Sequence, residues 1–252
     1  MAAQNQLYLD LSHYYDQFCD HIDYAEQSQF AYRAHQCFST SGDRQFLDLG
    51  CGTGQLLKLM EEQGFTVTGL DNSQDMLNQA ALRCPQATLM LNDLADFERH
   101  NEFDLITSFL YSMHYSHPLS AFHETLRCAY QALKPGGAFI FDAVDKHGIA
   151  NDTGVVSELQ LADEKLTFRS RWWYSGQGDV LDLFLSITRE SGPDSQTWSD
   201  HHKMTALDIR DLQRVMDSMG YETFILDRDY SRLCEWNGET FNVIIVGVKT
   251  LA

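Results

Sequence analysis

Three glycines and one acid are the residues whose types and spacing point most directly to chemistry. The segment 46–55 reads FLDLGCGTGQ, so that an apolar run enters Gly50, Gly52 and Gly54 and a helical pattern follows. Glycine lets a backbone turn tightly and approach a ligand without a Cβ in the way. Asp71 ends the next apolar run, about 20 residues downstream, where a carboxylate can meet a ribose hydroxyl. This spacing predicts a site for a ribose-containing ligand.

The glycine loop fits neither of the two common phosphate-binding patterns. A dinucleotide fingerprint, G-x-G-x-x-G, needs a third glycine where this chain has Gln55 or, in the other register, Leu57. A phosphate-binding P-loop needs a Lys after its glycines, and none follows here. Asp48, inside the loop segment, would repel a pyrophosphate and attract a cation. A NAD-dependent oxidoreductase is therefore the less favoured alternative.

Imidazole and carboxylate side chains are the candidates for proton transfer. His114 follows the fourth predicted strand, and the pair His201 and His202 precedes a late predicted helix. Histidine has an ordinary pKa near 6.5, which suits proton removal at neutral pH. Asp142 and Asp145, after the fifth predicted strand, form a second set. We expect His114 or His201 to lie at the ligand-binding crevice and to act as catalytic base. The alternative is that both are solvated loop residues.

The elements that must position these residues alternate between strands and helices. The expected strands lie at 46–50, 66–71, 87–91, 103–109 and 138–142, and the expected helices at 55–63, 74–83 and 121–133. Near-continuous apolar strands separated by helices are typical of a parallel sheet covered on both faces. Residues 1–45 carry aromatic side chains at roughly helical spacing, which predicts an N-terminal helical cap.

The pattern changes after about residue 150. Polar and apolar residues alternate over 155–204, and Gly176 and Gly178 lie where a hairpin turn would fall. We therefore expect residues 151–204 to form an antiparallel β insertion. Its Trp172-Trp173-Tyr174 run would place aromatic side chains on both faces, one of them a candidate cover for the active site or a homodimer contact.

The last segment returns to the main sheet. A helix is expected at 206–219, closed by Gly220, and strands at 222–226 and 241–248 should pair antiparallel. The predicted fold is α/β with an antiparallel tail on its sheet. Residues 46–150 together with 205–252 would form the ligand-binding domain.

Composition excludes several classes of partner. The chain has 252 residues, with 36 Asp and Glu against 18 Lys and Arg, for a formal charge of −18. Such a surface repels phosphate backbones and anionic headgroups, so we expect neither nucleic acid nor membrane as a partner. The six cysteines are scattered, the N-terminus has no signal-peptide pattern, and no zinc spacing occurs. These features predict a cytoplasmic protein without a metal.

Five segments resemble, in order, the motifs of class I S-adenosylmethionine-dependent methyltransferases. They are LDLGCGTG at 47–54, GLDNS at 69–73 followed by Met76, NDL at 92–94, FDLITS at 103–108 and LKPGG at 133–137. Weaker likenesses at 15–24 and 200–206 are to the small-molecule subgroup, which includes N,N-dimethyltransferases of nucleotide-linked amino sugars. The resemblance implies a Rossmann-like sheet of seven strands, mostly parallel with the last strand antiparallel.

The resemblance also implies how the methionine half of S-adenosylmethionine would be held. Asp48 would face its ammonium group, and Phe109 and Leu110, at the end of the fourth strand, would lie beside its sulfonium. The backbone that packs against the methionine portion would come from Gly50, Cys51, Gly52 and Gly54.

The nucleoside half would lie over the next two strands. Asp71 would accept hydrogen bonds from both ribose hydroxyls. Asn72 and Met76 would line the adenine, and Asp93 would accept from its amino group, with the Leu94 amide nearby.

Two residues of the N-terminal helices complete the expected site. The resemblance places Tyr15 and Arg33 within reach of the cofactor, with Arg33 directed to its carboxylate. Tyr15 is also a candidate catalytic residue if neither His114 nor His201 serves.

The function expected from this resemblance is methyl transfer from S-adenosylmethionine to a small soluble metabolite, more at nitrogen than at oxygen. Displacement at a sulfonium needs a base only to free the lone pair of the nucleophile. An amine therefore needs little help from a base, whereas a hydroxyl needs a general base to remove its proton. The alternatives are a catalytically silent or regulatory S-adenosylmethionine-binding protein and, less favoured, the oxidoreductase.

Overall fold

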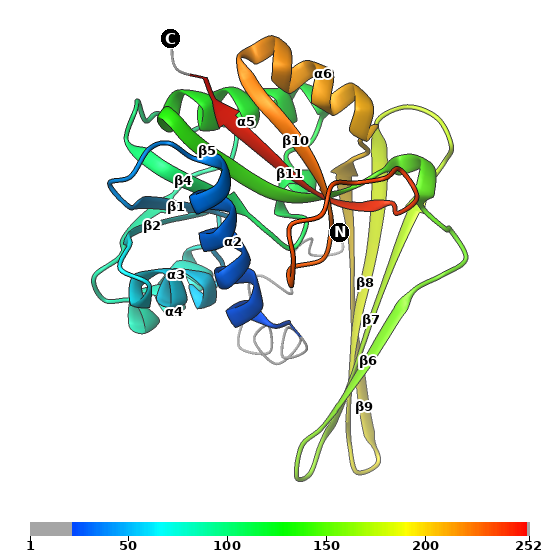
Figure 1. Cartoon of the computed structure of the whole chain (residues 1–252). Coiled ribbons are helices and arrows are strands. Elements are labelled where there is room, and N and C mark those ends of the chain that lie inside the picture. Colours follow the sequence, from blue (N-terminus) through cyan, green and yellow to red (C-terminus); the bar gives the residue numbers. More distant parts are fainter. Residues whose placement is uncertain (1–21, 251–252) are drawn as a thin grey trace.

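A computed structural model describes residues 22–250 of the chain and shows two sheets (Figure 1). The larger has seven strands in the order β10-β11-β5-β4-β1-β2-β3, and the smaller has four in the order β6-β7-β8-β9. The expectations for residues 1–21, Tyr15 among them, lie outside the described residues.

The seven-stranded sheet is mostly parallel. Its strands are β1 (Gln45–Leu49), β2 (Thr66–Asp71), β3 (Thr88–Leu91), β4 (Phe103–Ser108), β5 (Leu133–Val144), β10 (Tyr221–Asp227) and β11 (Asn242–Lys249). Strands β3, β2, β1, β4 and β5 pair in parallel, whereas β11 runs antiparallel to both β5 and β10. The predicted α/β fold and its antiparallel tail are confirmed.

Helices cover both faces of this sheet and bury it on both sides. They are α2 (Tyr24–Phe38), α3 (Gln55–Glu62) and α4 (Gln74–Arg83) on one face, and α5 (Leu119–Ala132) and α6 (Ile209–Met219) on the other. Phe122, Leu126 and Ala129 recur at helical spacing along α5, and all three are fully buried. The Ser73 hydroxyl accepts from the Met76 N–H and caps α4, an interaction worth about 1 kcal/mol.

The fifth strand is longer than predicted. Periodicity indicated a strand at 138–142, but β5 spans Leu133–Val144. It lies between β4 and β11: pairing with β11 continues to Val144, and pairing with β4 begins at Leu133, with a register shift before Ala138. The LKPGG segment is therefore an irregularity within the strand, where Gly136 has φ of 78°.

The four-stranded sheet is the predicted insertion, and all its pairs are antiparallel. Its strands are β6 (Val155–Gln160), β7 (Lys165–Tyr174), β8 (Val180–Ser191) and β9 (Asp194–Thr205). The predicted hairpin turn is confirmed between β7 and β8, where Gly176 and Gly178 have φ of 83° and 75°. One face buries Phe168, Leu183 and their neighbours, and the opposite face stays exposed. Figure 1 shows these long strands projecting beyond the main sheet.

Candidate functional site

Backbone hydrogen bonds attach the glycine loop after β1 to the end of β2. The N–H groups of Gly50 and Cys51 donate to the Leu70 carbonyl at 2.8 and 3.0 Å. The Gly52 N–H donates to Oδ2 of Asp71 at 2.9 Å. The acid predicted from its spacing to the glycines therefore also holds the loop in place.

All three glycines of the loop are required by geometry. Gly50, Gly52 and Gly54 have φ of 76°, 53° and 80°, in the left-handed region that favours glycine. A Cβ on Gly54 would lie 3.1 Å from the Cβ of Ala80, so the missing side chain also lets the loop approach α4 closely. The loop thus enters α3 in a conformation that few other residues could adopt.

A cavity lies beside this loop at the carboxyl edge of the sheet. It is lined by Tyr24, Gln27, Asp48, Gly50, Cys51, Gly52, Thr53, Gln55, Leu56, Phe109, Leu110 and Ser112. Six of the predicted cofactor residues are thus brought together, from β1, the glycine loop and the end of β4. Tyr24 and Gln27 of α2 were missed, because periodicity gives no register between a separate helix and a sheet edge.

Asp48 is the buried charge of this cavity. Its side chain is 5% exposed, and Oδ1 accepts the Thr107 hydroxyl at 2.7 Å. Burial raises the pKa of Asp48 to about 7; the Thr107 hydrogen bond opposes that rise and the charge of Asp71 adds to it. A buried carboxylate without a cationic partner is costly, so this position favours a cationic ligand group.

The nucleoside side of the expected site follows the next strands. Asp71 ends β2, its Oδ1 accepts from the Ser73 N–H at 2.9 Å, and burial raises its pKa. Asn72 is exposed beside it, and Met76 is buried in the first turn of α4. Asp93 and Leu94 follow β3, with Asp93 exposed at the same edge. The sheet order β4-β1-β2-β3 therefore places the ends of the strands that carry these residues along one edge.

The structure contradicts the predicted role of His114 as catalytic base. Its side chain is fully buried, with Nδ1 2.7 Å from the Thr205 carbonyl oxygen and Nε2 accepting the Val144 N–H at 3.1 Å. A carbonyl only accepts, so Nδ1 carries the proton and both ring nitrogens are occupied. Burial lowers the pKa of His114 to about 4. The neutral ring joins the segment after β4 to β5 and β9.

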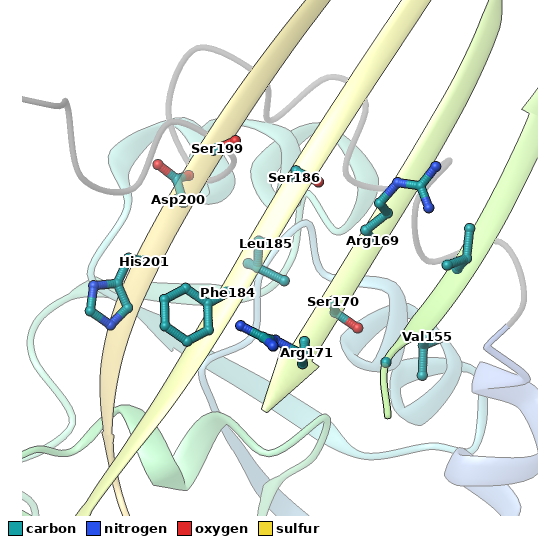
Figure 2. A pocket seen from close by; sticks show the side chains of 12 residues that line it. Val155, Arg169, Ser170, Arg171, Phe184, Leu185, Ser186, Ser199, Asp200 and His201 are labelled. Atoms are coloured by element: carbon teal, nitrogen blue, oxygen red, sulfur yellow. The ribbon is translucent and has the colours of Figure 1, made fainter. Parts of the chain in front are cut away.

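His201 also lies away from the expected crevice. It belongs to β9, not to a loop before the helix, and it lies on the exposed face of the insertion. Its ring stacks on Phe184 at 4.6 Å between centroids, and Nε2 is 2.6 Å from Oδ1 of Asp182 (Figure 2). The prediction that His201 faces the reacting groups is therefore contradicted.

His202, the neighbour of His201, lies on the buried face instead. Successive side chains of a strand point to opposite faces. His202 Nδ1 is 3.2 Å from the Tyr115 hydroxyl, in the segment that follows β4, and burial lowers its pKa. The alternation predicted over 155–204 could have separated the two histidines, because neighbouring residues of a strand lie on opposite faces.

The remaining candidates are engaged elsewhere. Arg33 donates from Nη2 to the Tyr230 carbonyl at 2.6 Å and does not line the cavity, so the structure does not support its contact with a cofactor carboxylate. Asp145 accepts from the His147 N–H at 3.2 Å. The Asp142 carboxylate is fully buried and accepts several hydrogen bonds. Neither carboxylate lines the cavity at the glycine loop.

A second hollow, of about 790 Å³, lies on the insertion and shares no lining residue with the cavity at the glycine loop. In Figure 2, Arg171, Phe184 and His201 lie side by side on β7, β8 and β9. Arg169 lies on the same strand as Arg171, two residues before it. The Arg171 guanidinium lies 5.2 Å from the centre of the Phe184 ring. This basic and aromatic face is separate from the predicted site.

No helix within 22–250 is long and apolar enough to cross a membrane. Over the same residues, no cluster of three or more His, Cys, Asp or Glu side chains could hold a metal ion.

Comparison with known proteins identifies relatives over most of the chain. Residues 46–137 match the family model described as methyltransferase domain. The dTDP-3-amino-3,4,6-trideoxy-alpha-D-glucopyranose N,N-dimethyltransferase of Streptomyces venezuelae is 31% identical over 182 residues, which cover 72% of this chain and 76% of that protein. An alignment with a methyltransferase homologue from Geobacillus sp. (strain WCH70), at 30% identity, covers 54% of this chain and 56% of that relative.

Solved structures show the same fold. The crystal structure of Streptomyces venezuelae DesVI has a TM-score of 0.81 at 21% identity and covers 96% of this chain and 99% of that one. The S-adenosylmethionine-bound amino pentose methyltransferase CalS10 from Micromonospora echinaspora has a TM-score of 0.77 at 17% identity, with 94% and 96% covered.

Proposed function

Since this chain belongs to the S-adenosylmethionine-dependent methyltransferases, we propose that it methylates a nitrogen atom of a small molecule, with an amino sugar as the preferred class of acceptor. The relatives support this choice of class, because one is named as an N,N-dimethyltransferase of an amino sugar and another as an amino pentose methyltransferase.

The residues of the cavity fit S-adenosylmethionine. Asp48, buried with its pKa raised to about 7, would be stabilised by the ammonium group of the methionine portion. Asp71 keeps lone pairs for ribose hydroxyls beyond those that accept the Gly52 and Ser73 N–H groups. When bound, the cofactor supplies an activated methyl group together with its own leaving group.

The protein's part in such a transfer is to bind, orient and exclude water. The nucleophile must be held about 3–3.5 Å from the methyl carbon and in line with the bond that breaks. The cavity walls at Phe109 and Leu110 would shield the reacting end, because Phe109 is buried and Leu110 half-buried. We propose that alignment and desolvation, more than proton transfer, provide the rate enhancement.

The state of His114 is the observation that carries the choice of nitrogen. This imidazole, the strongest predicted base at the end of β4, has both nitrogens engaged by backbone groups and a pKa lowered to about 4. A neutral amine already presents its lone pair, whereas a hydroxyl needs a base to remove its proton. An arrangement without His114 as base favours the amine.

A paired screen of acceptors tests this proposal. A nucleotide-linked amino sugar and its counterpart with a hydroxyl in place of the amine are incubated with S-adenosylmethionine, and release of S-adenosylhomocysteine is measured. We expect turnover of the amine alone, rising with pH as the amine loses its proton. Turnover of the hydroxyl compound alone would contradict nitrogen as the acceptor. Cofactor binding without turnover of any amine or hydroxyl acceptor would favour the regulatory alternative.

We also propose that the protein is cytoplasmic and that it forms a homodimer through the exposed face of the insertion. Val156, Trp173 and Phe184 are 53%, 39% and 36% exposed there, and exposed apolar and aromatic groups on one face favour an interface. The five cysteines of the described residues are all free thiols, as a reducing compartment favours. Light scattering should give twice the chain mass, and Trp173→Ser with Phe184→Ser should give monomers. A monomeric parent protein would contradict the proposed dimer.

A further inference from the structure

The segment that follows β4 has an unusual backbone. Leu110 and Tyr111 have φ of 57° and 61°, in the left-handed region that side chains other than glycine rarely adopt. Within residues 22–250, four non-glycine residues have positive φ, and these two are the only neighbours among them. Such a conformation persists only where surrounding contacts impose it.

Asp142 of β5 provides those contacts. Its side chain is fully buried, Oδ1 accepts the Tyr111 N–H at 2.7 Å, and Oδ2 accepts the Leu110 N–H at 3.2 Å. One carboxylate thus binds both strained residues through their backbone. A side-chain amide could not replace it, because one of its two ends is a donor.

The loop between β10 and β11 holds the carboxylate from its other side. Arg228 Nε donates to Oδ2 of Asp142 at 3.1 Å, and the Tyr230 hydroxyl donates to the same oxygen at 2.9 Å. The Arg228 guanidinium lies 4.8 Å from the centre of the Tyr111 ring and 5.1 Å from that of Tyr230. Charge pairing and four donors therefore fix Asp142 in one orientation.

The strained segment forms a wall of the cofactor cavity. Phe109, Leu110 and Ser112 line it together with Asp48 and Gly50. A Cβ placed on Gly50 would lie 3.0 Å from Ser112, so the segment and the glycine loop are closely packed. With the proposed adenine and ribose contacts at the ends of β3 and β2, the methionine portion would extend across β1 toward β4. The segment would therefore border the reacting end.

We infer that Asp142 is a positioning residue for methyl transfer: by holding Leu110 and Tyr111 in the left-handed conformation, it sets the wall against which the methyl group and its acceptor align. The part of this inference that concerns the acceptor rests on the proposed function. The first measurement below, of the bound methyl group, needs only S-adenosylmethionine. Asp142 acts through the backbone of its neighbours and is assigned no proton transfer.

The test compares Asp142→Asn with Asp142→Asn/Leu110→Gly, using S-adenosylmethionine labelled with ¹³C in its methyl group. In Asp142→Asn we expect the bound methyl resonance to shift and broaden, while affinity for S-adenosylhomocysteine changes less than threefold. With an amine acceptor, kcat should fall at least tenfold. Glycine adopts positive φ without help, so the double variant should recover part of both losses.

Asp104 offers a matched control at the opposite edge of the sheet. It is also fully buried, it accepts the Asp43 and Gln45 N–H groups at 3.2 and 2.8 Å, and it pairs with Lys134 at 3.1 Å. Asp104→Asn should lower stability without moving the methyl resonance. An equal resonance shift in Asp104→Asn, or an unchanged resonance and kcat in Asp142→Asn, would overturn the inference.

A second variant covers the case in which Asp142→Asn does not fold. Arg228→Gln keeps the carboxylate but removes its charged partner, and we expect a shifted methyl resonance with a threefold to tenfold loss of kcat. An unchanged resonance and kcat in Arg228→Gln would then overturn the inference. Absence of any bound methyl resonance in the parent protein would refute the proposed function itself, which separates the two failures.

Discussion

The backbone N–H of Gly52 donates to the carboxylate of Asp71 at 2.9 Å, so the residue expected to hold the ribose also holds the glycine loop. Loop and acid come from the ends of adjacent strands, β1 and β2, which pair in parallel register. Loss of the carboxylate would therefore have two effects: it would remove the proposed acceptor for the ribose hydroxyls, and it would release the loop proposed to hold the methionine portion.

Asp71→Ala should weaken binding of S-adenosylhomocysteine at least tenfold. Each hydrogen bond to a charged group is worth roughly 1.5–3 kcal/mol, and the variant removes those to ribose while freeing the Gly52 N–H. Isothermal calorimetry measures the affinity. Asp75→Ala is the control, since Asp75 is an exposed acid four residues along the chain, and it should bind as the parent does. An Asp71→Ala affinity within twofold of the parent would show that Asp71 does not hold the ribose.

Binding of S-adenosylhomocysteine should strengthen as pH rises through 7. Asp48 has a pKa of about 7 without ligand, and only its ionised form attracts the ammonium group of the methionine portion. Below that pKa, affinity should fall by about tenfold for each pH unit, because binding must release the proton. Calorimetry from pH 5.5 to 8.5 gives the profile, and Asp48→Asn should flatten it. A flat profile in the parent protein would contradict this role for Asp48.

The same carboxyl should oppose folding in the absence of ligand. Its folded-state pKa of about 7 exceeds the ordinary value of 3.8, so the folded protein binds more protons between these values and stability falls as pH rises through that window. Asp48→Asn should therefore raise the melting temperature of the ligand-free protein at pH 8 and change it little at pH 4. Equal melting temperatures at pH 8 would argue against an ionised, buried Asp48.

The course of the main sheet could be predicted from the sequence because its signals are local. Apolar runs, the glycines after β1 and Gly220 after α6 each act within a few residues. The burial of His114 could not be predicted, because its hydrogen-bond partners are backbone groups of Thr205 and Val144, 91 and 30 residues away. Periodicity does not indicate that three distant segments meet at one imidazole.

The acceptor side shows a second limit of sequence reasoning. The alternation over 155–204 predicts the strand that holds both histidines but not which of its faces is buried; in β9, His201 is exposed and His202 is buried. A one-residue choice of face decides whether a side chain can reach a site. The role inferred for Asp142 likewise depends on the left-handed backbone of Leu110 and Tyr111. That conformation cannot be predicted from the sequence, because Leu and Tyr rarely adopt it.

S-adenosylhomocysteine should raise the melting temperature, and NAD should not. A ligand that binds only the native state adds about 2.7 kcal/mol at 100 times its dissociation constant. For a chain of this size that corresponds to an increase of roughly 5–10 °C. Differential scanning fluorimetry with each ligand makes the comparison. A shift with NAD and none with S-adenosylhomocysteine would contradict the fit of the cavity, where Asp48 would repel a pyrophosphate.

His114→Ala should lower the free energy of unfolding markedly and change the rate of methyl transfer only modestly. The change leaves the Val144 N–H and the Thr205 carbonyl unpaired in the core and opens a cavity, which together cost about 2–5 kcal/mol. Thermal or urea unfolding measures this loss, and His100→Ala, at an exposed position, should show none. At a temperature where His114→Ala is folded, methyl transfer to an amine should stay within about tenfold of the parent.

The pH dependence of that loss distinguishes a buried neutral imidazole from a catalytic base. Burial lowers the folded-state pKa of His114 to about 4, below the unfolded value near 6.5, so the unfolded chain binds more protons between these values. The stability that His114 contributes is therefore complete above pH 6.5 and is lost as pH falls toward 4. The difference in unfolding free energy between parent and His114→Ala should shrink over that window. A difference that does not vary with pH, together with a loss of kcat of a hundredfold or more in the folded variant, would restore His114 as the base.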